Sequence, residues 1–169
     1  CWRSDRGGHG ELDLEEALAD SCNVALMHMA FDLGKEKFLT YQELFNFGLK
    51  TNIDLAGETR TASLVHDYDT MGETELATSS FGQGFNVTMI QEISAFCSLI
   101  NGGYYYEPHM VERIIASDGS TVENIAPRVL KQTVSATTSA MMREYLHATV
   151  AEGTGRNAYV PGYHVAGKT

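Results

Sequence analysis

The sequence has few basic residues, few cysteines and no long apolar run. Its 12 lysines and arginines are outnumbered by 22 aspartates and glutamates, which gives a formal charge of −10 with neutral histidines. Nucleic-acid backbones and anionic membrane surfaces attract basic proteins, so we expect neither as a partner. No apolar stretch reaches the roughly 18 to 20 residues that cross a bilayer, and the start does not resemble a signal peptide. We therefore expect any membrane anchor to lie outside this chain.

The usual sequence patterns of metal, disulfide and nucleotide sites are also missing. The three cysteines form no C-x-x-C pair, and the six histidines show no H-x-x-x-H spacing, so we expect neither a disulfide framework nor a metal site. Cys97 lies in an apolar helical pattern, which predicts a small core residue. The terminal G-K-T lacks the upstream glycines of a phosphate-binding loop, so we reject nucleotide binding and expect no cofactor.

What is present is enough apolar material for a core. With 169 residues, 43% of them hydrophobic, the chain can form one globular domain, which we assign to residues 1–169. Asp13 with Glu16, and Thr88 with Gln91, are capping-box patterns that predict helix starts. Apolar spacing predicts helices over 14–20, 24–33, 36–47, 88–100 and 135–151.

The remaining segments predict strands and loops. Residues 110–116 and 121–125 flank an Asp118-Gly119 turn, which is a hairpin pattern. Residues 49–80 hold little periodicity and are expected to form a long surface loop. The alternation before Lys168 predicts a strand at the end of the chain. The fold class is therefore α+β with helices dominant.

Two short motifs carry chemistry only in combination. Ser21-Cys22-Asn23 alone is an ordinary pair of capping residues around a helix break, and Gly167-Lys168-Thr169 alone is weak. In this order they match the S-x-N and K-T-G elements that accompany S-x-x-K in penicillin-binding proteins and class A β-lactamases.

The flanking segments strengthen the match. They are GHGELDLEEALADSCN (8–23), ATSSFGQGFNVTMIQ (77–91), INGGYYYEPHMV (100–111), AEGTGRNA (151–158) and VAGKT (165–169). In sequence and in order, these five segments resemble the transpeptidase domain of class B penicillin-binding proteins. The resemblance implies a partial penicillin-binding-protein or serine β-lactamase-like fold: mostly the helical subdomain, with a hairpin and the K-T-G strand.

The resemblance also implies that parts of the site are missing. No S-x-x-K pattern occurs in residues 1–169. We expect the glycine that completes K-T-G to follow Thr169, outside this chain. We expect the nucleophilic serine and its lysine to lie before Cys1, and the chain as given to be inactive. The exposed sheet edge and apolar face of such a truncated domain predict dimerisation or aggregation.

The family's mechanism implies a role for each remaining site residue. These enzymes acylate a serine with a peptidoglycan stem peptide and pass the acyl group to an amine on a neighbouring stem; β-lactams acylate the same serine. Ser21 would relay a proton, Asn23 would position the donor peptide, and Lys168 would supply a cation. Thr169 would bond the substrate carboxylate, and Gly167 and Gln83 would contribute to substrate binding.

Two other proteins of the same fold remain alternatives. One is a β-lactam sensor, but Asn23 argues against it because sensors commonly have S-x-V at this motif. The other is a serine β-lactamase, which would be expected to lack the F-G-Q-G flank around Gln83. The expected partners are stem peptides and β-lactams, with other cell-wall synthesis proteins possible, and the expected location is the extracytoplasmic face of the bacterial cell membrane.

Overall fold

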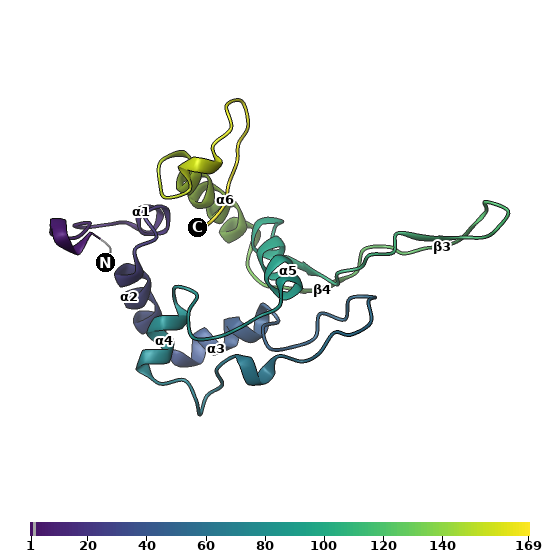
Figure 1. Cartoon of the computed structure of the whole chain (residues 1–169), viewed down its shortest axis with the longest axis horizontal. Helices are drawn as coiled ribbons and strands as arrows, with labels where there is room; N and C mark the ends of the chain where they lie inside the picture. Colours follow the sequence, from purple (N-terminus) through teal and green to yellow (C-terminus); the bar gives the residue numbers. More distant parts are fainter. Residues whose placement is uncertain (2) are drawn as a thin grey trace.

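Helices dominate the chain, and they are arranged around a ring (Figure 1). The computed structural model describes residue 1 and residues 3–169. Within this range the α-helices are α1 (Leu14–Ala19), α2 (Asn23–Leu33), α3 (Lys35–Leu44), α4 (Glu73–Ser79), α5 (Met89–Ile100) and α6 (Ala136–Ala151). The strands are β1 (Tyr104–Tyr106), β2 (Arg113–Ile115), β3 (Thr121–Asn124) and β4 (Val129–Gln132). The predicted α+β class is confirmed.

The strands form a long hairpin that projects away from the helices (Figure 1). β2 pairs antiparallel with β3 around the Asp118-Gly119 turn, as the sequence predicts. Nearer the helices, β1 pairs antiparallel with β4, with Tyr105 opposite Lys131. Each ladder contains a register shift, which bends a narrow two-stranded ribbon. Tyr105 is fully buried and fixes the base of the hairpin against α5.

Capping explains where two of the helices begin. The Asp13 carboxylate accepts a hydrogen bond from Glu16 N at 2.9 Å, while the Glu16 side chain accepts one from Asp13 N at 3.0 Å. Thr88 and Gln91 make the same reciprocal pair at the start of α5. Each box satisfies two backbone N–H groups that have no partner inside the helix, so both predicted starts are confirmed.

The prediction of a long loop over 49–80 is wrong at its end, where α4 forms. Glu75 reaches back to accept a hydrogen bond from Gly72 N at 3.0 Å, which caps the helix from within. Leu76 and Met71 then pack with Ala30 of α2 in the buried core cluster. Because this helix has only seven residues and buries one apolar side chain, its apolar residues do not repeat often enough for the helix to be predicted from the sequence.

The predicted strand at the end of the chain is also wrong. Residues 164–169 have no strand assignment, and Gly167 N donates instead to the carbonyl of Leu146 at the side of α6. A strand requires a neighbouring strand, and the hairpin strands of the described residues pair with one another. The segment is therefore held by a helix rather than by a sheet.

Cys97 is exposed, which corrects its predicted place in the core. The buried positions of α5 are Gln91, Ala95 and Ser98. Because each residue turns the helix by about 100°, Cys97 points roughly 200° away from Ala95. Large apolar side chains are exposed elsewhere too, including Met89, Ile93 and Met141.

Candidate functional site

A tight turn between α1 and α2 presents Ser21. The N–H of Ser21 donates to Leu18 O at 3.2 Å, and the N–H of Cys22 donates to Ala17 O at 3.0 Å, which closes the end of α1. Ser21 has φ 49°, a left-handed conformation that is uncommon for a residue with a side chain. Strained backbone of this kind is concentrated at functional sites. The turn buries the Cys22 side chain and leaves Asn23 as the exposed first residue of α2.

Lys168 reaches across to this turn from the other end of the chain. Its Nζ donates a 2.7 Å hydrogen bond to Ser21 Oγ and another of 2.7 Å to its neighbour's carbonyl, Thr169 O. The two motifs singled out in the sequence therefore meet in space. A hydroxyl that accepts from an ammonium is free to donate its own proton elsewhere, which is the arrangement a proton relay needs.

Burial around the Lys168 ammonium lowers its pKa below the ordinary value of 10.5. Although the residue as a whole is exposed, the surroundings of its charged end exclude part of the water that would stabilise the charge. A lowered pKa makes the lysine a better proton donor than one in open solvent.

Thr154 connects the two halves of this site. Its N–H and its hydroxyl both donate to Ala19 O, at 2.9 Å and 3.1 Å, which ties it to the end of α1. The same hydroxyl oxygen lies 2.6 Å from Thr169 Oγ1. Since the Thr154 hydroxyl donates its proton to Ala19, it accepts from Thr169. The structure thus assigns a positioning task to a residue that the sequence marked only as part of A-E-G-T-G.

The segment that carries Lys168 is held against α6 at two further points. Nδ1 of His147 lies 3.0 Å from Val165 O and, since a carbonyl only accepts, this nitrogen carries the proton. Gly167 N donates to Leu146 O at 3.1 Å. Gly167, predicted to bind substrate, therefore orients the segment through its backbone. Nothing in the sequence pattern singled out His147.

The other predicted site residues are not joined to this pair. Among the described residues, no hydrogen bond links the Asn23 side chain with Ser21 or Lys168. Gln83 is exposed in the turn after α4, where its N–H donates to Thr78 O at 3.0 Å. The next residue, Gly84, accepts a hydrogen bond from His66 Nε2 at 2.9 Å. Substrate roles for Asn23 and Gln83 remain predictions.

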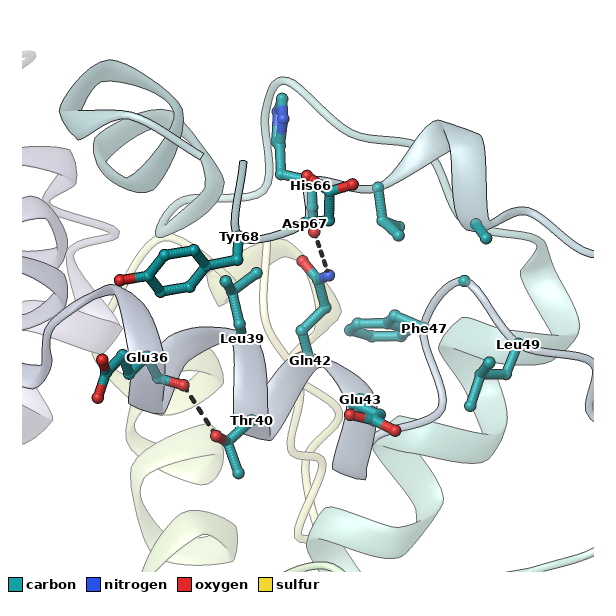
Figure 2. Close-up of a pocket in the computed structure, with 13 residues that line it drawn as sticks. Glu36, Leu39, Thr40, Gln42, Glu43, Phe47, Leu49, His66, Asp67 and Tyr68 are labelled. Atoms are coloured by element: carbon teal, nitrogen blue, oxygen red, sulfur yellow. Dashed lines mark hydrogen bonds between the residues drawn. The ribbon is translucent and has the colours of Figure 1, made fainter. Parts of the chain in front are cut away.

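A cavity of about 630 Å³ lies elsewhere, between α3 and residues 62–68. Figure 2 shows Gln42 of α3 pointing across it to donate to His66 O at 2.8 Å, with Tyr68 and Leu39 beside it. Neither Ser21 nor Lys168 lines this space. Its size alone does not make it the chemical site, because Ser21 and Lys168, the residues of the two matched motifs, both lie elsewhere.

Within the part of the chain that the structure describes, side chains of the types that bind metals meet at one place. The ligand atoms of Cys1, His9 and Cys22 all lie within 4.8 Å of one another, although their spacing in the sequence matches no known zinc pattern. This cluster lies directly beside the turn of Ser21.

Comparison with known proteins assigns this geometry to a family. The family model described as the penicillin binding protein transpeptidase domain matches residues 1–169. The chain belongs to this family. It is 43% identical over 170 residues to stage V sporulation protein D of Bacillus subtilis, covering all of this chain and 26% of that protein. It is 32% identical to penicillin-binding protein PbpB of Mycobacterium tuberculosis, covering 88% of this chain and 22% of that protein.

A solved structure shares the transpeptidase fold. Penicillin-binding protein 3 of Mycobacterium tuberculosis, in complex with aztreonam, matches with a TM-score of 0.82 and 30% identity, covering 92% of this chain and 36% of that chain. This chain therefore spans about a quarter of the curated relatives and about a third of the solved structure. The recognised family is confirmed. No helix in the described residues is both long and apolar enough to cross a membrane.

Proposed function

We propose that the complete protein in which this chain occurs, hereafter the parent protein, is a class B peptidoglycan D,D-transpeptidase that β-lactams acylate. The observation that carries the proposal is the 2.7 Å hydrogen bond from Lys168 Nζ to Ser21 Oγ. It joins the S-x-N and K-T elements of a chain whose family is the transpeptidase domain. The relatives are named as penicillin-binding proteins or as a sporulation protein, which favours a transpeptidase over a sensor or a β-lactamase.

The site residues act on the proton and on the substrate's charge. Ser21 passes a proton between the catalytic serine–lysine pair and the leaving nitrogen, while Lys168 stabilises the hydroxyl oxygen during that transfer. Lys168 also binds the terminal carboxylate of a stem peptide or the carboxylate of a β-lactam, and the Thr169 hydroxyl joins it by turning its proton from Thr154 to that carboxylate. Asn23, at the start of α2, positions the donor peptide backbone. Gly167 holds the Lys168 segment, and Gln83 contributes to binding from the turn after α4.

The acyl-enzyme forms on a serine that residues 1–169 do not contain. The sequence has no S-x-x-K pattern, so the isolated chain should give no covalent adduct. A fluorescent penicillin incubated with the parent protein and separately with the isolated chain tests both statements after denaturing electrophoresis. We expect a heat-stable fluorescent band for the parent protein alone. An adduct on the isolated chain would refute its inactivity, and the lack of one on the parent protein would refute the function.

The substrate determines where the parent protein works. Peptidoglycan stem peptides lie outside the cytoplasmic membrane, so this domain acts at its outer face, anchored by a segment outside residues 1–169. The exposed apolar residues Met89, Ile93 and Met141 are covered in the parent protein by the rest of the domain. In the isolated chain the same surfaces favour dimerisation.

A further inference from the structure

The glycine-rich segment before α1 folds back onto the turn that carries Ser21. Gly8 and Gly10, on either side of His9, have φ values of 87° and 78°, which residues with side chains rarely adopt. This backbone directs the imidazole of His9 inward, and its side chain is only 2% exposed. His9 lines one cavity together with Cys1 and Cys22.

The three side chains offer two sulfur atoms and one nitrogen atom to a single point. Cys1 Sγ and His9 Nδ1 lie 3.1 Å apart, and all three ligand atoms are within 4.8 Å of one another. Around a tetrahedral zinc ion, with Zn–S near 2.3 Å and Zn–N near 2.0 Å, ligand atoms are separated by roughly 3.5 Å. The observed spacing therefore needs only small side-chain rotations to surround an ion.

The second nitrogen of His9 faces a carboxylate. Nε2 lies 3.8 Å from Asp20 Oδ2, while Nδ1 faces Cys1 Sγ. Metal-bound histidines generally donate their other N–H to such a group, which fixes the ring and makes the ligating nitrogen more basic. Asp20 directly precedes Ser21, so the same contact joins the cluster to the site turn.

We propose that Cys1, His9 and Cys22 bind one zinc ion, with water as the fourth ligand. Two thiolates and one imidazole form a donor set that suits Zn²⁺, whereas oxygen ligands would suit Mg²⁺ or Ca²⁺. The two thiols lose their protons to solvent when the ion binds. Because Cys22 lies between Ser21 and Asn23, the ion anchors the turn that presents Ser21. The sequence concealed the site because Cys1, His9 and Cys22 form neither a C-x-x-C pair nor another familiar zinc spacing.

Cobalt binding to the parent protein tests this directly. The protein is reduced, stripped of metal and titrated with Co²⁺, whose thiolate complexes absorb through sulfur-to-cobalt charge transfer. We expect one ion per chain and loss of the absorption when equimolar Zn²⁺ is added. Cys1→Ser and Cys22→Ser should each weaken binding at least tenfold. Cys97→Ser, which alters an exposed cysteine outside the cluster, should leave binding unchanged.

A second measurement does not depend on the folding of variants. Zn²⁺ should protect Cys1 and Cys22 of the reduced parent protein from alkylation, while Cys97 reacts at the same rate with and without the ion.

Asp20→Asn should keep the cobalt–thiolate absorption but weaken the affinity for the ion about tenfold. Three results would each overturn the proposal. One is equal alkylation of all three cysteines in the presence of Zn²⁺, and another is cobalt binding without thiolate absorption. The third is a protein that has a Cys1–Cys22 disulfide and still binds no ion once that disulfide is reduced.

Discussion

Lys168 Nζ lies 2.7 Å from Ser21 Oγ although 147 positions separate the two residues. The contact closes the chain between the turn after α1 and the segment beside α6. Here the chemistry of the two motifs meets, because a lysine with a lowered pKa directly contacts a hydroxyl held in strained backbone. The first two predictions follow from this pair.

Ser21→Ala should slow acylation of the parent protein by penicillin about a hundredfold. The variant removes the hydroxyl through which the proton passes, and general acid–base catalysis is typically worth 10² to 10⁴ in rate. The measurement is the second-order rate constant for labelling by a fluorescent penicillin. Ser117→Ala, beside the hairpin turn, is the control and should react at the wild-type rate. Unchanged kinetics in Ser21→Ala would remove the relay role.

Lys168→Ala should weaken both acylation and recognition of the carboxylate. Wild-type protein should react much faster with a β-lactam acid than with its methyl ester, because the ester lacks the charge that Lys168 binds. In the variant this preference should shrink about tenfold or more. Lys37→Ala, on α3, should retain the full preference. If Lys168→Ala discriminates acid from ester as well as wild type, then Lys168 does not bind the carboxylate.

Thr154→Val should disturb the site without touching the substrate. The valine side chain has nearly the same shape but can neither donate to Ala19 O nor accept from Thr169, so the 2.6 Å link between the two hydroxyls is lost while the backbone N–H bond to Ala19 O stays. We expect the free energy of unfolding to fall by about 1 kcal/mol and the acylation rate to fall several-fold. Thr154→Ser keeps the hydroxyl and should restore the acylation rate. A serine variant as slow as the valine variant would show that the methyl group, not the hydroxyl, matters.

The local parts of this fold could be predicted from sequence, and the parts that depend on distant contacts could not. The capping boxes at Asp13 and Thr88 specify helix starts through neighbours three residues away, so they are visible in the sequence. In contrast, α4 depends on the burial of Leu76 against α2, and the state of residues 164–169 depends on whether a partner strand is present.

The candidate site divides in the same way. Ser21 and Lys168 were predicted by family resemblance, and the structure brings them together. Thr154 and His147 act through hydrogen bonds to backbone carbonyls, and such bonds leave no pattern of residue types in a single sequence. The cluster of Cys1, His9 and Cys22 was missed because the metal patterns searched for have short spacings, whereas here a folded-back loop brings the ligands together.

Glu58→Gln should destabilise the fold and make its free energy of unfolding less dependent on pH. Burial raises the pKa of Glu58, but hydrogen bonds from Thr51 and Asn52 together with the charge of Lys50 outweigh it and hold the pKa below the ordinary 4.5. A carboxylate with a lowered pKa adds stability above its unfolded-state pKa, and that stability is lost as the pH falls through the folded-state value.

The measurement is chemical denaturation of the parent protein from neutral pH to below about pH 4.5. At neutral pH the glutamine variant should unfold more easily by about 1 to 3 kcal/mol, since the hydrogen bonds to a charged acceptor are weakened. The difference in unfolding free energy between the variant and the wild type should then become smaller as the solution is acidified. Glu123→Gln, on exposed β3, is the control. A difference that stays constant with pH would contradict the proposed role of the ionised carboxylate.

Gly153→Ala should force the end of α6 away from the end of α1. A β-carbon at Gly153 would lie 2.2 Å from Ala19 O, the same carbonyl that accepts both bonds from Thr154. We expect a loss of about 1 to 3 kcal/mol in unfolding free energy, together with slower acylation as the Ser21 turn shifts. Gly162→Ala is the matched control, because nothing lies within 4 Å of its β-carbon and only its φ of 85° is strained. If the Gly162 variant loses as much stability and activity as the Gly153 variant, then close packing against Ala19 does not hold the site together.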